Sequence, residues 1–185
     1  MQKNPMFLGE KVYLVPIESQ HLEVYYEKLQ EASYDSCFYT GSKKIITMAQ
    51  LKAYVERIEV DNERLDLFIV SQKADEIVGE VVLNDIDFEN RCSSIRIALF
   101  LDENFNQGYG SEAMALTVNY GFGMFNLNRI ELEVYAYNER AIHVYKKLGF
   151  KEEGICRQCL YFNHAYHDAY RMSILSQEYK GLNPS

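Results

Sequence analysis

Two glycines stand one residue apart in the segment Asn106–Ala113 (NQGYGSEA), between an apolar run and a run with helical periodicity. The free N–H groups at the start of a helix, together with the helix dipole, attract a phosphate. Glycines let the backbone approach that phosphate without a Cβ in the way. Gly108 and Gly110 therefore predict a phosphate-binding loop at the beginning of a helix.

Two nucleotide-binding motifs can be compared with this loop. A nucleoside-triphosphate loop needs a Lys directly after its last glycine, and no Lys follows Gly108 or Gly110. The dinucleotide fingerprint G-x-G-x-x-G/A is also present and ends at Ala113. An acid about 20 residues further on, Glu131 or Glu133, stands where a ribose contact would lie. Three strand-like runs precede the loop, whereas a dinucleotide-binding domain usually begins with it, so an NAD-binding oxidoreductase is the less favoured alternative.

Apolar periodicity predicts the elements that must position the loop. We expect the order β-α-α-β-β-β-α-β-α-β-β in one domain over residues 1–185, an α/β (α+β) fold with a mixed, mostly antiparallel sheet flanked by helices. The runs with strand character are 11–15, 65–71, 76–85, 93–101, 129–136, 150–162 and 166–175. The runs with helical character are 18–32, 47–58, 111–125 and 138–148.

Residue types at the helix ends support these boundaries. Ser19 is a candidate N-cap of the first helix, and Thr47 with Gln50 spells a capping box for the second. Asn138 is a candidate N-cap of the last helix, and Gly149 stands just past its end. The last helix therefore begins directly after a strand, as the glycine-loop helix does.

A second motif, N-x-x-A-x-x-x-Y-x-x-x-G-F, occupies residues 138–150 (NERAIHVYKKLGF), about one strand-and-helix unit after the glycines. The pair of motifs resembles the GNAT superfamily, the Gcn5-related N-acetyltransferases, whose loop reads [QR]-x-x-G-x-[GA]. Within it, the chain is most similar to the branch of ribosomal-protein N-terminal and spermidine N-acetyltransferases, which end in a segment like 161–175 (YFNHAYHDAYRMSIL). The resemblance extends from about Leu65 to Leu175 and implies the GNAT fold.

The resemblance implies acetyl-CoA as cosubstrate. The pyrophosphate would lie on the glycine loop and helix start, and the pantetheine arm would lie between two splayed strands, paired with exposed backbone of the strand before the loop. A backbone N–H there could stabilise the oxyanion. Asn138 would reach the same arm. The implied cofactor-binding residues are Leu99, Phe100, Leu101, Asn106, Gln107, Gly108, Tyr109, Gly110, Ser111 and Asn138.

The resemblance assigns the general acid to Tyr145. The leaving group is a thiolate whose parent thiol has a pKa near 8.5, and a phenol with a pKa of about 10 stays protonated and can donate to it. The helical spacing of Ile142, Tyr145 and Leu148 is also that of a core face, so a packing role is the alternative.

The acceptor must lose a proton, because an alkylammonium has a pKa near 10. Glu80, in the run GEVVLND, is the candidate base, with Asp85 behind it, and a solvent-facing strand acid is the alternative. Two residues depart from the family pattern. Arg96 stands where many relatives carry an acid, and Phe105 stands where they carry Gln or Arg.

Charge and composition restrict the partners. The formal net charge of −8 argues against nucleic acid and is compatible with a cationic acceptor. No apolar stretch approaches the roughly 20 residues of a membrane span, and the first residues lack a secretory signal, so we expect a cytoplasmic protein with no membrane contact, as a monomer or homodimer. Cys156 and Cys159 form one C-x-x-C without a second half, so no metal is expected.

The sequence thus predicts an N-acetyltransferase that passes acetyl from acetyl-CoA to a primary amine by direct attack. The acceptor classes left open are a polyamine, a protein N-terminus and another small amine. The loop between the first two helices, residues 33–44, is the expected specificity element, because binding residues favour loops on a rigid scaffold. Phe105 keeps open an alternative from another class, a CoA-binding sensor without catalysis.

Overall fold

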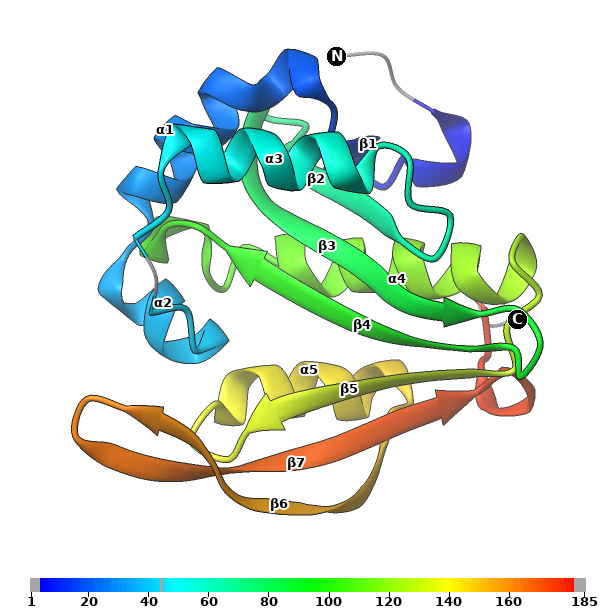
Figure 1. The fold of residues 1–185 in the computed structure, drawn as a ribbon. Coiled ribbons are helices and arrows are strands. Elements are labelled where there is room, and N and C mark those ends of the chain that lie inside the picture. The colour runs from blue at the N-terminus through cyan, green and yellow to red at the C-terminus, as the bar shows by residue number, and fades with distance from the viewer. Residues whose placement is uncertain (1–3, 44, 182–185) are drawn as a thin grey trace.

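A single seven-stranded sheet with helices on both faces forms the protein in a computed structural model, which describes residues 4–43 and 45–181 (Figure 1). The strand order is β1-β2-β3-β4-β5-β7-β6, and every neighbouring pair is antiparallel except β4 and β5, which are parallel. The predicted mixed, mostly antiparallel sheet is confirmed, and it is not the parallel sheet of a dinucleotide-binding domain. The strands span Val12–Pro16 (β1), Leu65–Ser71 (β2), Glu76–Asp87 (β3), Cys92–Leu99 (β4), Arg129–Tyr135 (β5), Lys151–Phe162 (β6) and Ala165–Leu175 (β7).

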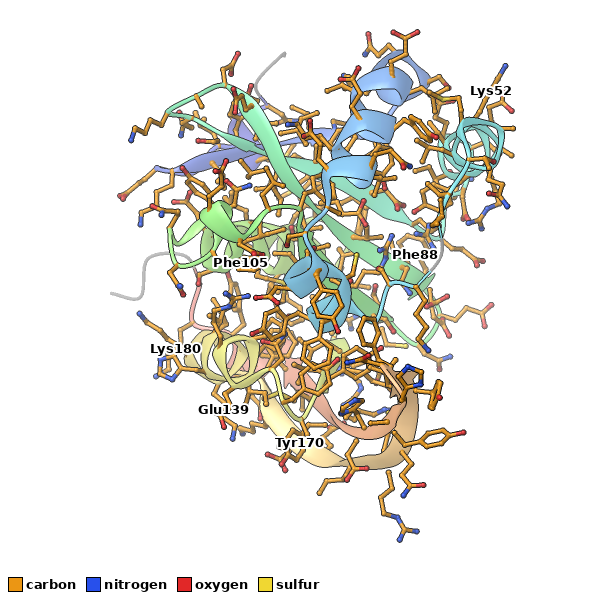
Figure 2. The ribbon with its side chains drawn as sticks, turned by 90° about the vertical axis from the view of Figure 1, so that its left-hand side faces the viewer. Lys52, Phe88, Phe105, Glu139, Tyr170 and Lys180 are labelled. Atoms are coloured by element: carbon orange, nitrogen blue, oxygen red, sulfur yellow. The ribbon has the colours of Figure 1, made fainter. Side chains whose placement is uncertain are left out.

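The helices divide between the two faces of the sheet, as Figure 2 shows from the end of the molecule. One face packs against α1 (Leu22–Glu31) and α3 (Met48–Ile58), and the other against α4 (Tyr109–Gly123) and α5 (Glu139–Leu148), so each face has its own apolar core. None of the helices in the described ranges is long and apolar enough to span a bilayer. Single 3-10 turns lie at Pro5–Phe7, Ser19–His21, Asp102–Asn104 and Ser176–Glu178.

The helix ends follow the sequence signals at three of four places. Thr47 and Gln50 form the expected capping box of α3. Asn138 caps α5 by accepting the N–H of Ala141 at 3.1 Å, and Gly149 ends that helix with φ +101°. The prediction that Ser19 caps the first helix is wrong. Ser19 lies in the preceding 3-10 turn and its hydroxyl donates to Glu59 at 2.7 Å, so α1 begins after His21 without a side-chain cap.

The expected loop between the first two helices contains a helix, α2 (Tyr34–Thr40), at the end of β4. Ser33 caps it by accepting the N–H of Ser36, and Gly41 ends it in the left-handed conformation, with φ +70°. The described residues therefore contain one α-helix more than the predicted order, and its caps were present in the sequence as Ser33 and Gly41. Lys44, the last residue of the expected loop, lies outside the described residues.

Candidate active site

The two central strands diverge and leave a cavity between them. β4 and β5 pair over only three residues each, Cys92–Ser94 and Arg129–Glu131, and then separate (Figure 1). A cavity of about 840 Å³ opens at this divergence, a volume typical of small-molecule sites. Its walls come from both strands, α2, the beginning of α4 and the first two turns of α5. Elements from distant parts of the sequence thus meet at one site.

The N-terminus of α4 opens onto this cavity with unpaired N–H groups. Gly108, with φ +85°, is the N-cap, and no side chain caps the helix. The first intrahelical bond runs from the N–H of Glu112 to the carbonyl of Gly108, at 3.1 Å. The N–H groups of Tyr109, Gly110 and Ser111 therefore have no helical acceptor. A helix start of this kind can bind an anion, and the phosphate-binding role of the loop stays a prediction.

Two charged side chains anchor the glycine loop from behind. The Lys11 ammonium donates to the carbonyl of Gln107 at 2.9 Å. The Glu112 carboxylate accepts the N–H groups of Glu10, Lys11 and Val12, each at 2.8 Å. Glu112 is thus bound to β1 and its preceding turn, and it does not occupy the anion-binding end of its own helix. Gln107 is outside the cavity wall, although the sequence placed it among the cofactor contacts.

Asn138 and Tyr145 both line the cavity from α5. The Asn138 side chain is buried and its oxygen serves as the helix cap, whereas its amide nitrogen has no hydrogen-bond partner among the described residues. The Tyr145 hydroxyl likewise has no partner in the described chain. Burial raises the pKa of Tyr145 to about 12, although the nearby Arg140 charge lowers it. Tyr145 is therefore a neutral phenol in any near-neutral assay.

The β4 backbone offers different groups to the cavity than the sequence suggested. Phe100 donates its N–H to the carbonyl of Val78 at 3.0 Å, and its carbonyl accepts the N–H of Ser33 at 2.9 Å. Backbone groups alternate in direction along a strand, so those of Leu99 and Ile97 point towards the β5 side. The Leu99 carbonyl accepts the Ser36 hydroxyl at 2.6 Å. Leu99 thus keeps its predicted position at the divergence, Phe100 lines the cavity with its backbone already paired, and Leu101 is not part of the wall.

Phe105 belongs to a cluster that the sequence analysis did not detect. The Arg140 guanidinium carbon lies 3.8 Å from the centre of the Phe105 ring and 4.9 Å from that of Tyr39. All three residues line the cavity, and Figure 2 shows Phe105 beside α2 and above α5, which begins at Glu139. No acid is paired with Arg140 among the described residues. Arg140 and Phe105 are 35 positions apart, so local sequence patterns could not predict their contact. The one signal in the sequence was that Phe105 stands where the family carries a polar residue.

Glu80 is a buried member of an ion-pair network, not a solvent-facing acid. One of its oxygens accepts Arg96 Nη1 at 2.9 Å and the other accepts the Tyr25 hydroxyl. Arg96 Nη2 also donates to the Tyr54 hydroxyl at 3.2 Å, and that hydroxyl donates to Asp66 at 2.8 Å. Glu80 and Arg96 both line the cavity. Asp85, the second candidate, is exposed, has φ +53° and is not in the cavity wall.

The remaining acid in the cavity wall is also paired. Glu133 accepts Arg171 Nη2 at 2.7 Å. Cys156 lies next to this pair, with its sulfur 3.7 Å from Glu133 Oε1, and all four cysteines are free thiols. Within the described residues, no group of three or more His, Cys, Asp or Glu side chains is placed to hold a metal ion.

Comparison with known proteins identifies the class that this fold and site define. The family profile described as "Acetyltransferase (GNAT) domain" matches residues 11–151. A Bacillus subtilis protein described as "Probable N-acetyltransferase YjcK" is 30% identical over 187 residues, which cover 94% of this chain and 98% of that protein. The chain therefore belongs to the GNAT acetyltransferase family.

Other relatives match over a shorter region. The Escherichia coli K12 spermidine N(1)-acetyltransferase is 36% identical over 104 residues, 56% of this chain and 55% of that protein. An uncharacterized N-acetyltransferase, p20, of Bacillus licheniformis is 34% identical over 113 residues, 61% of this chain and 63% of the relative. The chain thus spans less than two thirds of the length of both proteins.

Solved structures share the fold. The Vibrio cholerae spermidine N-acetyltransferase, in complex with CoA and spermine, superposes with a TM-score of 0.82 over 92% of this chain and 99% of that one, at 23% identity. The predicted GNAT fold is confirmed by this likeness.

Proposed function

We propose that the protein transfers the acetyl group of acetyl-CoA to a primary amine. The observation that carries the proposal is the convergence of three features on one cavity: the uncapped N-terminus of α4, the divergence of β4 from β5, and Tyr145. The first suits a phosphate, the second an extended arm that adds to a strand edge, and the third a leaving thiolate. The similarity to N-acetyltransferases supports the same activity.

In this proposal the cosubstrate binds mainly through the backbone. The pyrophosphate would accept the N–H groups of Tyr109, Gly110 and Ser111, which matters in a chain with a net charge of −8. The pantetheine arm would pair with the free edge of β4 at Ile97 and Leu99, and the Asn138 amide would donate to it. A β4 N–H beside the thioester would also stabilise the oxyanion.

The reaction is a direct displacement. The amine nitrogen attacks the thioester carbon, a C–N bond forms, and the C–S bond breaks as the tetrahedral intermediate collapses. Tyr145 donates its proton to the departing sulfur, and the second proton of the attacking nitrogen passes through water to Tyr145 as the amide forms. The proton lost by the ammonium passes to Glu80 through a water molecule, because both carboxylate oxygens already accept hydrogen bonds from protein groups.

A thiol-release assay with acetyl-CoA and a panel of polyamines, peptides and small amines tests the activity. We expect release of CoA that depends on the amine, with an acetylated amine visible by mass spectrometry. Binding of CoA with no turnover on any amine would instead support a CoA-binding sensor. Thermal stabilisation by CoA but not by NAD would separate both from a dinucleotide-binding protein.

The role of Glu80 needs its own measurement. In Glu80→Gln we expect kcat to fall by roughly 10²–10⁴-fold, because the amide cannot accept the proton. An unchanged kcat in a folded variant would remove Glu80 from the mechanism. Circular dichroism of the variant is the necessary control, because the change leaves Arg96 without its carboxylate partner.

A further inference from the structure

The charges in the wall of the cavity point to the chemical class of the acceptor. We propose, on the basis of the acetyl transfer proposed above, that the acceptor is a small primary amine that carries a carboxylate, and that Arg96 binds this carboxylate. The proposal replaces the expectation of a cationic acceptor that the net charge of the whole chain suggested.

Neither acid in the described cavity wall is free to bind an ammonium group. The wall contains two, Glu80 and Glu133. Glu80 is paired with Arg96 at 2.9 Å and Glu133 with Arg171 at 2.7 Å. A polyamine such as spermidine keeps two further positive charges when one amine reacts, and it needs unpaired carboxylates or other acceptors to hold them. The wall therefore lacks what a polycation requires.

The bases in the wall outnumber the acids. Lys43, Arg96 and Arg140 line the cavity among the described residues. Arg140 lies against Phe105, beside the loop proposed for the CoA phosphates. Its charge can therefore serve the cosubstrate and need not bind the acceptor. Lys43 is exposed, on the segment after α2. Arg96 is left, in the strand that would hold the thioester; it is paired with Glu80, but unlike that carboxylate it keeps unused donors.

Arg96 lies on the face of β4 opposite to the cosubstrate side. Its neighbours Ile95 and Ile97 pack into the core beneath α4, whereas Arg96 contacts Glu80 and Tyr54 on the α1 and α3 face. The amine must approach the thioester from a side that the cosubstrate does not cover. Arg96 is thus placed to contact the acceptor and not the CoA arm.

The guanidinium still has donors to offer. About half of the Arg96 side chain is exposed, 49%, while its partner Glu80 is 7% exposed. Its hydrogen bonds to Glu80 and Tyr54 use one donor from each terminal nitrogen, Nη2 also lies 3.9 Å from Asp66 Oδ1, and Nε has no partner among the described residues. A guanidinium carries five N–H groups, so enough remain for a two-point contact with a carboxylate. The ion pair with Glu80 holds the planar guanidinium in the orientation that this contact needs.

The test compares amines that differ only in the acid. Initial rates of thiol release would be measured with ω-amino acids and their primary amides, in which several methylenes keep the amine pKa nearly equal. α-Amino acids, an aminoalkylphosphonate, spermidine and an uncharged monoamine complete the panel. We expect kcat/KM for the carboxylate to exceed that of its amide by at least roughly 10-fold, a typical value for one charged hydrogen-bonded contact.

Two variants test whether Arg96 causes the preference for the carboxylate over its amide. Arg96→Gln should abolish this preference by raising KM for the amino acid, with KM for acetyl-CoA unchanged. Arg96→Lys, which keeps a charge beside Glu80 and therefore the fold, should reduce it. Arg157→Gln, an exposed arginine outside the cavity, is the matched control.

The outcomes separate the two proposals. Spermidine as the best substrate, or a carboxylate preference that survives both Arg96 variants in folded protein, would overturn the acceptor class and leave acetyl transfer standing. A higher rate with the phosphonate than with its carboxylate twin would also overturn it. No amine-dependent thiol release at all would overturn the proposed function itself.

Discussion

The guanidinium of Arg140 lies over the ring of Phe105, with 3.8 Å between the guanidinium carbon and the ring centre. Such a contact holds a cation in place while leaving its N–H groups free to donate at its edge. Phe105 stands one residue before the segment 106–111, and Arg140 lies two residues after Asn138. The pair therefore sets a fixed positive charge between the two motifs that carry the GNAT resemblance.

This relationship gives a prediction for cosubstrate affinity. Arg140→Gln should raise KM for acetyl-CoA by roughly 10–100-fold, because a hydrogen bond between charged groups contributes about 1.5–3 kcal/mol. Phe105→Leu should raise KM for acetyl-CoA less, about 2–5-fold, because it removes only the cation–π contact with Arg140, which contributes about 0.5–1 kcal/mol. Steady-state kinetics at two salt concentrations checks both. An Arg140→Gln variant whose KM matches that of the control Arg157→Gln would show that Arg140 does not contact the phosphates.

The glycine loop gives a prediction for stability. Gly108 has φ +85°, a conformation that costs a residue with a Cβ about 1–2 kcal/mol. An added Cβ would also lie 2.7 Å from the Lys11 ammonium, which can move but would then leave the Gln107 carbonyl. Gly108→Ala should lower the urea midpoint and weaken CoA binding together.

The matched control for Gly108 lies on the same helix. Gly123 is in the last turn of α4, and apart from its chain neighbours and its own helix backbone no described atom would lie within 4 Å of a Cβ added there. Gly123→Ala should leave stability unchanged or raise it by up to about 1 kcal/mol, since Ala is the better helix former. Equal urea midpoints for Gly108→Ala and wild type would contradict the strain argument.

Two short motifs, through their resemblance to the GNAT superfamily, were enough to predict much of this site. Gly108, Asn138 and Tyr145 each belong to a motif of at most 13 residues, and the structure brings all three to one cavity. Such motifs are readable because a helix start, a cap and two helical turns are local features. The helix α2 was missed although its caps were present, because it has only seven residues and few periodic positions.

The charges of the cavity could not be predicted in the same way. Glu80 was a candidate for an exposed strand acid, yet it is buried, because both faces of β3 are covered by helices. Its partners Tyr25 and Arg96 lie 55 and 16 residues away and meet it only after the sheet forms. Net charge, a property of the whole chain, does not determine the sign of the charges that line one cavity.

Tyr145 gives a prediction for catalysis. Tyr145→Phe should lower kcat by roughly 10²–10⁴-fold, the usual contribution of a general acid. The packing should survive, because the hydroxyl has no partner among the described residues. Because burial raises the Tyr145 pKa to about 12, the hydroxyl stays protonated between about pH 6 and 9, and the loss of kcat should be independent of pH there.

Tyr161→Phe, at an exposed position of β6, is the control for Tyr145→Phe. A folded Tyr145→Phe variant with full kcat would leave Tyr145 a packing residue only.

Glu153 gives a prediction for acid stability. Its carboxylate accepts Arg129 at 2.7 and 2.6 Å, and Ser173 at 2.7 Å, which ties β6 to β5 and β7. The Arg129 bond lowers the Glu153 pKa to about 2, so its stabilisation is present above the unfolded value near 4.5 and is lost as pH falls from there towards 2. Because the side chain is 40% exposed, Glu153→Gln should cost only about 1 kcal/mol or less at pH 7.

Urea midpoints of wild type and Glu153→Gln, measured at pH 7, 4 and 2.5, should converge as the pH falls. Glu76→Gln is the control, because Glu76 is exposed and has no side-chain partner among the described residues, and it should follow wild type at every pH. A constant gap between wild type and Glu153→Gln down to pH 2.5 would mean that the Arg129 pair does not set this pH dependence.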